Sequence, residues 1–363
     1  MMDSSFLDLD IEAMEGWLRE VDESRLESLW KAADAARKAY VGDEVHLRGL
    51  VEISSYCIRK CAYCGLRAEH RDLQRYRMTR EEILECARQA REYGYGTVVL
   101  QSGEDYGITR EWLEDVVRAV KEQTGLAITL SLGERPDEDL VAWRAAGANR
   151  YLLRFETSDR ALYDRIHPPT LRQGLSDRIA LLKRLKQLGY EAGSGVMVGI
   201  PGQTYTSLAR DIALFRELDL DMIGVGPFIA HPDTPLGRGE LPLAAEGEQA
   251  PNTEFMTYKV LALTRLACPE ANIPSTTALA TLNLAQGREL GLMRGANVVM
   301  PNLTPVRYRA LYEIYPSKAC IRESAGDCSA CIQARIRSIG RLPGTGHGSR
   351  KHNQSDIPGI PAQ

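Results

Sequence analysis

Short apolar runs alternate with amphipathic segments along most of the chain after Val45. After each run, apolar residues recur every three or four positions, which is the period of a helix packed on one face. Because strands that alternate with helices are joined by crossovers, they are expected to be parallel. The predicted strands are Leu47–Ile53, Thr97–Leu100, Ala127–Leu130, Tyr151–Arg154, Gly195–Val198, Met222–Val225, an irregular stretch near Asn272–Thr277, and Asn297–Met300.

The amphipathic segments between these runs predict the crossover helices. In the first helix, Thr79 and Glu82 have the spacing of a capping box, and Gly94 follows as a stop signal. The predicted helices are Thr79–Tyr93, Arg110–Glu122, Asp137–Ala146, Ser176–Leu188, Ser207–Glu217, Thr253–Leu266 and Leu284–Met293.

Before the alternating region, residues 11–40 have helical periodicity and predict two helices, the second capped by Asp22 or Ser24. Eight strand–helix units predict an α/β fold, a complete (β/α)8 TIM barrel over residues 45–305. An open doubly wound sheet is the alternative, but no GxGxxG follows the first strand.

The barrel is expected to be flanked by two extensions. Residues 1–44 form an N-terminal helical extension, and residues 306–341 form a C-terminal segment that contains cysteines. The tail, residues 342–363, is rich in Gly, Ser, His and Pro and is expected to be disordered.

Three cysteines, Cys57, Cys61 and Cys64, follow the first strand within eight residues. Structural zinc needs four closed ligands, and ferredoxin-type clusters need four thiolates. Three thiolates can instead hold three irons of a 4Fe-4S cluster and leave the fourth iron open to a substrate. A zinc knuckle with a remote fourth ligand is the alternative.

The CxxxCxxC spacing, with an aromatic residue before the last cysteine, resembles the radical S-adenosylmethionine (SAM) superfamily. The resemblance implies a catalytic 4Fe-4S cluster on these cysteines, with SAM as the second cofactor. Polar residues at the carboxyl ends of the predicted strands, where barrel active sites lie, offer partners for SAM. We expect Tyr63 to pack on the adenine, Ser102 to belong to the segment that meets the amino group, Glu156 to accept the ribose hydroxyls, Arg178 to pair with the carboxylate, and Met197 to contact the adenosyl group. The structural alternatives are loop packing for Tyr63, a surface position for Arg178 and a core position for Met197.

Longer strings make the resemblance more specific, because together they look like the HydE family of FeFe-hydrogenase maturases. The strings are Cys57–Arg67, Leu73–Thr79, Val99–Asp105, Thr129–Glu134, Arg150–Thr157, Val198–Thr204, Gly224–Pro235, Asn272–Ala278 and Val299–Pro305. The resemblance implies reductive cleavage of SAM to a 5'-deoxyadenosyl radical, which acts on an iron carbonyl–cyanide–cysteine precursor of the hydrogenase di-iron site.

The same resemblance implies substrate contacts at Arg154, Thr276, Thr277, Tyr308 and Tyr312. It also implies partners: the other hydrogenase maturases, a small organometallic or other small-molecule substrate, and an electron donor such as ferredoxin or flavodoxin. Two alternatives remain open, a methylornithine-synthase-like mutase of the same group and a non-catalytic iron–sulfur carrier.

A second group of cysteines, Cys320, Cys328 and Cys331, lies near the C-terminus. Some HydE proteins carry an accessory iron–sulfur cluster there and others lack it, so the resemblance implies an accessory rather than a catalytic role. A zinc or redox site is the alternative.

Composition narrows the partners and the location. The chain has 45 basic and 49 acidic residues and a net charge of −4, which gives no sign of binding to nucleic acid or to an anionic membrane. It has no apolar run of about 20 residues, the length that spans a bilayer. The acidic first ten residues lack the features of a signal peptide. We therefore expect a cytoplasmic protein whose clustered thiols stay reduced.

Overall fold

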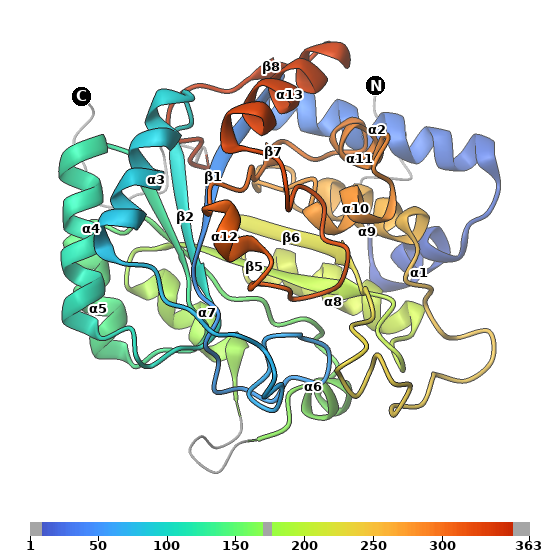
Figure 1. Cartoon of the computed structure of the whole chain (residues 1–363). Helices are drawn as coiled ribbons and strands as arrows, with labels where there is room; N and C mark the ends of the chain where they lie inside the picture. Colours follow the sequence, from blue (N-terminus) through green and yellow to red (C-terminus); the bar gives the residue numbers. More distant parts are fainter. Residues whose placement is uncertain (1–8, 170–175, 351–363) are drawn as a thin grey trace.

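The core of the fold is a curled parallel β-sheet, seen in the computed structural model, which describes residues 9–169 and 176–350 (Figure 1). Neighbouring strands follow the order β6-β5-β4-β3-β2-β1-β7, and β8 pairs with β1. Every strand pairing is parallel, as the alternation of strands and helices predicts. The strands are β1 (Glu44–Ser54), β2 (Thr97–Ser102), β3 (Ala127–Ser131), β4 (Arg150–Leu152), β5 (Glu191–Val198), β6 (Met222–Pro227), β7 (Val298–Val299) and β8 (Leu342–Pro343).

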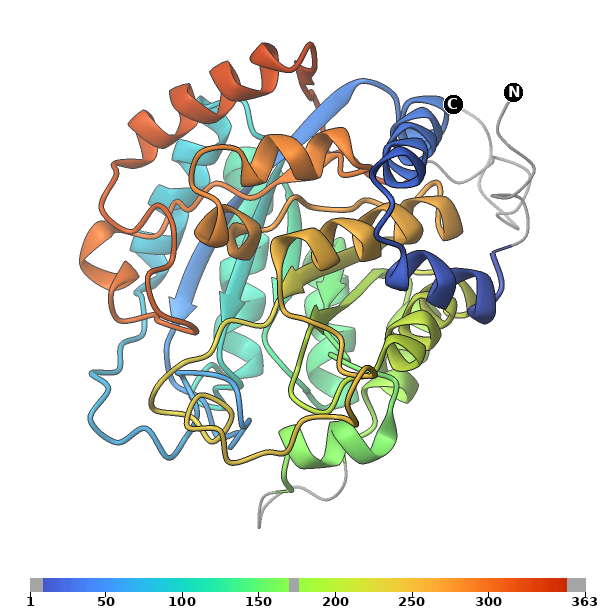
Figure 2. The same ribbon diagram turned by 90° about the vertical axis from the view of Figure 1, so that its right-hand side faces the viewer.

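Helices cover the outside of the sheet. In Figure 1, α3, α4 and α5 stand side by side along one flank, while Figure 2 shows α1 and α2 beside α8 and α9, on which they pack. None of the helices in the described ranges is long and apolar enough to cross a membrane. The helices are α1 (Ile11–Arg19), α2 (Glu23–Val41), α3 (Arg80–Glu92), α4 (Arg110–Thr124), α5 (Asp137–Ala146), α6 (Arg160–Ile166), α7 (Arg178–Gln187), α8 (Tyr205–Glu217), α9 (Glu254–Ala267), α10 (Thr277–Leu282), α11 (Gly287–Met293), α12 (Val306–Arg309) and α13 (Ala325–Ser338).

The predicted helix caps are confirmed where the side chains satisfy backbone donors. Thr79 and Glu82 form the expected capping box at the start of α3. At α2 the cap is Asp22 rather than Ser24, because Asp22 Oδ1 accepts the Arg25 amide at 2.9 Å. Such caps are worth about 1 kcal/mol each, so they help fix where the helices begin.

The irregular stretch predicted near Asn272–Thr277 is not a regular strand. It makes two isolated parallel bridges, Met222–Asn272 to β6 and Pro274–Val298 to β7. Pro274 has no amide hydrogen to donate, which explains why the pairing does not extend into a ladder. The stretch ends at Thr276, which caps α10 instead of continuing the sheet.

The segment from residue 342 to 350 is ordered against the floor of the sheet, so the expectation of disorder is wrong for these residues. Its backbone carbonyls accept hydrogen bonds from buried side chains of the strands: Thr97 and Arg150 bind the His347 carbonyl, each at 3.0 Å, and Arg48 binds the Gly348 carbonyl at 3.0 Å. The amino-acid composition of the segment does not indicate this order, because the groups that bind are backbone carbonyls, which every residue has. The rest of the predicted disordered tail, residues 351–363, lies outside the described residues.

Two glycines of this segment allow a matched test of its packing. Gly346 and Gly348 have φ angles of 66° and 60°, but a Cβ at Gly348 would lie 2.5 Å from His46 Cγ, whereas Gly346 has open space. Both alanine variants bear the cost of a left-handed residue, about 1–2 kcal/mol. We expect Gly348→Ala to lower the free energy of unfolding by about 1–3 kcal/mol more than Gly346→Ala does, because its new Cβ would overlap the His46 ring. Thermal unfolding should show a lower Tm for Gly348→Ala than for Gly346→Ala. Equal values would mean that the segment does not pack here.

Candidate active site

The cysteine loop after β1 has no regular secondary structure and is held by one half-buried arginine. The Arg75 guanidinium donates to the carbonyls of Ser55 (2.5 Å), Leu66 (2.8 Å), Arg67 (2.8 Å) and His70 (3.2 Å). These acceptors lie before and after the three cysteines in sequence. A single rigid fork of donors therefore fixes both ends of the loop that carries the thiols.

The loop is also pressed against the end of β2. A Cβ added at Gly103 would lie 2.3 Å from the Tyr56 carbonyl and 2.7 Å from Cys57 Cβ, so only glycine fits there. The next amide, that of Glu104, donates to Cys57 Sγ at 3.4 Å. Amide donors to a sulfur stabilise negative charge on it, which suits a thiolate that binds iron.

Burial raises the pKa of all three thiols: that of Cys61 to about 12, and those of Cys57 and Cys64 as well. A metal must therefore displace protons when it binds these sulfurs. Within the described ranges, no three His, Cys, Asp or Glu side chains converge on a point suitable for one metal ion.

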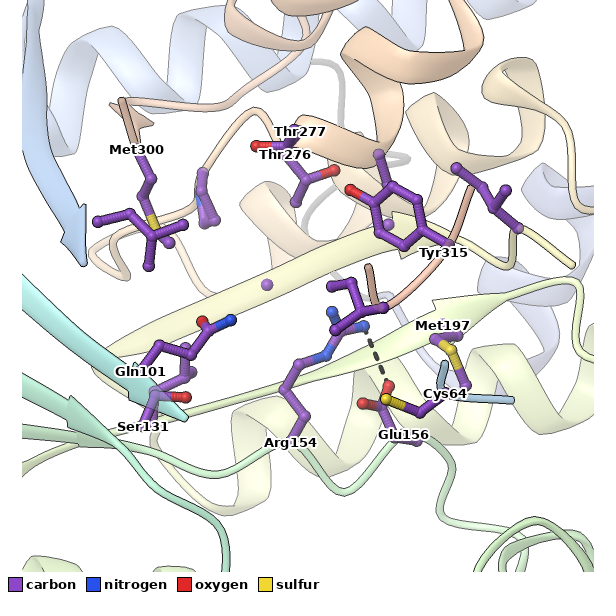
Figure 3. Close-up of a pocket in the computed structure, with 18 of the residues that line it drawn as sticks. Cys64, Gln101, Ser131, Arg154, Glu156, Met197, Thr276, Thr277, Met300 and Tyr315 are labelled. Carbon is purple, nitrogen blue, oxygen red and sulfur yellow. Dashed lines mark ion pairs between the residues drawn. The ribbon is translucent and has the colours of Figure 1, made fainter. Parts of the chain in front are cut away.

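A cavity of about 330 Å³ lies next to the loop, inside the curl of the sheet (Figure 3). In this view Cys64, Glu156 and Met197 gather at one end, whereas Gln101, Ser131 and Met300 lie at the other. The cavity brings together most of the residues predicted from the sequence: Tyr63, Cys64, Ser102, Arg154, Glu156, Arg178, Met197, Thr276, Thr277 and Tyr312 all line it. Cys57 and Cys61 lie on the same loop but outside the lining.

Glu156 occupies a strained position at the cysteine end. It is a buried residue with a φ of 64°, in the left-handed region that non-glycine residues rarely adopt. Burial raises the pKa of its carboxyl group, although Arg154 and Arg178 oppose this. Its Oε2 forms an ion pair with Arg154 at 3.0 Å but has no hydrogen-bond partner within the described structure. Strain and an open acceptor inside a cavity are typical of a ligand-binding residue and fit a ribose diol.

Arg178, at the start of α7, is buried rather than on the surface. Its Nε donates to Glu134 Oε1 at 3.0 Å and its Nη1 donates to the Arg154 carbonyl at 2.6 Å. Its pKa stays well above the usual value: burial lowers it, but Tyr63, Tyr163, Cys61 and Glu134 together raise it more. A permanent positive charge next to the cysteine loop fits a carboxylate ligand.

Tyr63 and Met197 meet in a small apolar cluster below the cysteine loop. The Tyr63 hydroxyl pairs with His167 Nε2 at 2.9 Å, and burial lowers the pKa of His167 well below its usual value, so this imidazole stays neutral. Met197 faces the cavity from β5. An aromatic ring and a thioether at one wall can take up the flat adenine and the sulfonium side of SAM.

Thr276 and Thr277, at the start of α10, also line the cavity, and the Tyr312 hydroxyl accepts a hydrogen bond from Gln101 Nε2 at 3.3 Å. Arg154 extends between the two ends (Figure 3). Hydroxyl, amide and guanidinium groups surround a space large enough for a small molecule.

Tyr308 does not line the cavity, contrary to the expectation from the resemblance. Its ring stacks on Tyr76 with centroids 4.4 Å apart, and its hydroxyl donates to Glu82 Oε1 at 3.0 Å. Tyr308 therefore packs α12 against the first turn of α3. Two aromatic residues four apart in the sequence, Tyr308 and Tyr312, thus have different roles, which the resemblance alone did not separate.

Several cavity residues were missed by sequence reasoning. Lys318 extends from the C-terminal segment and forms a buried ion pair with Glu52 of β1, and Tyr315 lies nearby in the lining. Glu52 had a detectable signal, since it is a charged residue inside the apolar run Leu47–Ile53. Lys318 and Tyr315 lie in an irregular segment, where no periodicity indicates which way a side chain points.

The second group of cysteines has a different environment. Cys328 and Cys331 lie on α13, and Cys320 precedes the helix with a φ of 63°. A hydrogen bond from Cys328 lowers the pKa of Cys320, and so does the nearby Arg288 guanidinium, whose Nη2 lies 3.6 Å from the sulfur. A lowered pKa favours the thiolate, which is the form of cysteine that binds metal. The third cysteine of the group, Cys331, is exposed to solvent.

Comparisons with known proteins show the family of the chain. Residues 51–231 match the Radical SAM superfamily model. The chain is 47% identical to the "[FeFe] hydrogenase maturase subunit HydE" of Thermotoga maritima, over 90% of this chain and 89% of that protein. It is 29% identical to the 3-methylornithine synthase of Methanosarcina acetivorans, over 76% and 75% of the two chains. The crystal structure of methylornithine synthase (PylB) superposes with a TM-score of 0.78 at 26% identity, over 94% of this chain and 96% of that one. The chain therefore belongs to the HydE family of radical SAM enzymes, which bind a 4Fe-4S cluster and SAM.

Proposed function

We propose that this chain is an FeFe-hydrogenase maturase in which Cys57, Cys61 and Cys64 hold the catalytic 4Fe-4S cluster. The observation that supports the proposal is one shared cavity, which is lined by Cys64, by the expected SAM contacts and by further polar groups. Figure 3 shows Cys64, Glu156 and Met197 at one end of it and Gln101 and Ser131 at the other. A molecule at the far end would therefore face the place where SAM is cleaved. The identity of 47% to a maturase, against 29% to a mutase, favours maturation over amino-acid rearrangement.

The cluster and SAM, when bound, supply a 5'-deoxyadenosyl radical by one-electron cleavage of the sulfonium. The task of the protein is to orient SAM and to exclude water. Arg178 pairs with the carboxylate, Glu156 accepts the ribose hydroxyls, and Tyr63 and Met197 cover the adenosyl group. The segment at Ser102, whose hydroxyl donates to the Gly103 carbonyl at 2.5 Å, presents backbone carbonyls to the ammonium. Each role rests on a side chain or turn that lies against the cavity or the cysteine loop.

For the far end we propose a small anionic substrate, an iron carbonyl–cyanide–cysteine species delivered by a partner maturase. Arg154, Thr276, Thr277 and Tyr312 would bind it by hydrogen bonds, since cyanide and carboxylate groups are acceptors. An amino-acid mutase would need an acid and a base free to bind its substrate. Here Glu52 and Lys318 are paired with each other, and Glu52 also accepts a hydrogen bond from the Asn302 amide at 3.1 Å. This acid and this base are therefore not free to bind an amino acid.

A closed cavity requires a closed barrel, and we infer that residues 272–274 complete it. Their bridges to Met222 and Val298 connect the two ends of the curled sheet, so that residues 45–305 would form a full (β/α)8 unit. Residues 1–44 and 306–341 would then be additions to this unit, and the latter supplies Lys318 to the cavity. A primary carbon radical reacts with most groups near it, so enclosure protects the chemistry.

A cysteine substitution tests the assignment of the cluster. With anaerobically reconstituted protein, dithionite and SAM, the wild type should form 5'-deoxyadenosine. Cys61→Ala should reduce it to background, because the cluster would lose one of its three protein ligands. Cys268→Ala is the matched control: this half-buried cysteine at the end of α9 lies outside the cavity lining and should leave the rate unchanged. An active Cys61→Ala variant with full iron content would contradict the assignment.

Two tyrosines separate SAM cleavage from substrate binding. Tyr312→Phe removes a hydroxyl from the far end of the cavity, which should lower hydrogenase activity in a complementation assay about tenfold, the worth of one hydrogen bond. Production of 5'-deoxyadenosine should persist in this variant. Tyr308→Phe, the matched control, changes a hydroxyl outside the cavity and should mature hydrogenase normally. The reverse ranking of the two variants would contradict the proposed substrate end.

The second group of cysteines should be accessory. Cys331 is exposed and lies away from the cavity, so Cys331→Ser should not disturb folding. We expect formation of 5'-deoxyadenosine within about twofold of wild type, the range of ordinary surface substitutions. Iron content should fall if Cys320, Cys328 and Cys331 hold a second cluster. Loss of SAM cleavage with the first cluster intact would make this group catalytic.

A further inference from the structure

A buried hydrogen-bond network lies next to the segments that carry Glu156 and Met197. Its centre is Asp211, on the buried face of α8, whose side chain is fully buried. Asp211 is not among the residues that line the cavity. A buried carboxylate is costly unless its oxygens receive hydrogen bonds, so its partners show which parts of the chain it holds in place.

One oxygen of Asp211 holds the segment that follows Glu156. Asp211 Oδ1 accepts the Ser158 amide at 2.6 Å and the Ser158 hydroxyl at 2.5 Å. Ser158 lies two residues after Glu156, whose left-handed φ of 64° is unfavourable for a residue with a side chain. The rings of Phe155 and Phe215, with centroids 5.5 Å apart, join the same segment to α8. Two bonds to a carboxylate therefore support the strained backbone beside them.

The other oxygen of Asp211 faces Gln203, in the turn between β5 and α8. Gln203 Nε2 donates to Asp211 Oδ2 at 3.4 Å and to the Met197 carbonyl at 3.0 Å. Its Oε1 accepts the amides of Gly199 (2.6 Å) and Ile200 (3.2 Å). Gln203 is fully buried and uses both ends of its amide group to hold this turn. Met197 and Ile200 belong to the small apolar cluster described above.

We propose that Asp211 is a positioning residue for SAM, which fixes the Glu156 segment and the Met197 turn relative to each other. The inference rests on the proposed function, in which Glu156 accepts the ribose hydroxyls and Met197 covers the adenosyl group. Ribose and adenine are bonded directly, so the two segments must keep one separation to bind both at once. Asp211 acts through Ser158 and Gln203, and this preorganisation lowers the entropic cost of binding.

Only a carboxylate can hold both segments at once. Each oxygen of Asp211 faces N–H or O–H donors, and an ionised carboxylate accepts at both oxygens. An asparagine would direct its NH2 group either at the Ser158 amide or at the Gln203 amide, and two donors repel each other. A reversed Gln203 amide would lose the hydrogen bonds to Gly199 and Ile200.

Protonation of Asp211 should have the same effect as the asparagine. Burial raises the pKa of Asp211 to about 7, and the negative charge of Asp159, at the start of α6, also raises it, whereas the neutral donors Ser158 and Gln203 lower it. A proton on either oxygen turns an acceptor into a donor. The network is therefore complete at a pH above this pKa and is lost as the pH falls through it.

The test measures SAM binding without turnover. The probe is SAM itself, added anaerobically to the reconstituted holoprotein with its cluster left oxidised, so that no sulfonium bond is cleaved. Equilibrium dialysis gives the Kd one unit above and one unit below the pKa of Asp211. The variants are Asp211→Asn and the milder Ser158→Ala, which removes one of the two bonds to Oδ1. The matched control is Asp221→Asn, the same change in another buried aspartate, whose Oδ2 accepts the Ala192 amide at 2.8 Å outside the cavity lining.

We expect Asp211→Asn to raise the Kd for SAM about tenfold at the higher pH, and Ser158→Ala to raise it about threefold, because hydrogen bonds to a charged group are strong. Asp221→Asn should bind SAM as wild type does, although both aspartate variants lose thermal stability. Wild type should bind SAM more weakly at the lower pH. Asp211→Asn should lose most of this pH dependence, which a purely structural role would leave in place.

An unchanged Kd in folded Asp211→Asn would overturn the inference. The same increase in Asp221→Asn would also overturn it, because the effect would then be a general loss of stability. If thermal unfolding shows that Asp211→Asn does not fold, an unchanged Kd in Ser158→Ala decides against the inference. A pH dependence in Asp211→Asn equal to that of wild type would contradict it as well. Failure of wild type to bind SAM, with full iron content, would instead refute the proposed function.

Discussion

The hydrogen bonds of Arg75 are the interaction on which the candidate site depends most. The cysteine loop has no regular backbone hydrogen bonds of the kind that hold a strand or a helix. The Arg75 guanidinium instead donates hydrogen bonds to four of its backbone carbonyls. Because the acceptors lie on both sides of the cysteines in sequence, one side chain connects the two ends of the loop. The close approach of Gly103 then sets the loop against β2. The three thiols take their positions from this arrangement.

The sequence was informative wherever a local rule decides the outcome. Alternating runs predicted the parallel strands β1 to β6, and the capping box at Thr79 placed the start of α3. The CxxxCxxC spacing led to the loop, and the rule that barrel sites lie at the carboxyl ends of strands led to Ser102, Glu156 and Met197, all of which line the cavity. The strands, the cap and the place of these residues in the cavity wall could be predicted because period, cap and strand end are properties of short stretches of chain.

The sequence failed where long-range contacts decide. The order of residues 342–350 comes from buried donors such as Arg48 and Arg150, which lie far away in the sequence. Tyr308 and Tyr312 look equivalent in the sequence, but stacking on Tyr76 draws one of them out of the cavity. Lys318 enters the cavity because Glu52 is buried opposite it. In each case the two partners are about two hundred residues or more apart along the chain, so no local sequence pattern indicates the contact.

In the proposed site, three cysteines leave one iron of the cluster open, and SAM occupies that position beside Glu156 and Arg178. Electron–nuclear double resonance on the reduced cluster, with SAM labelled by ¹⁵N in its amino group and ¹⁷O in its carboxylate, tests this most directly. We expect hyperfine couplings from both labels to the cluster, and their loss in the Cys61→Ala variant. A reduced cluster in wild-type protein that shows no coupling to either label, with SAM bound, would contradict it.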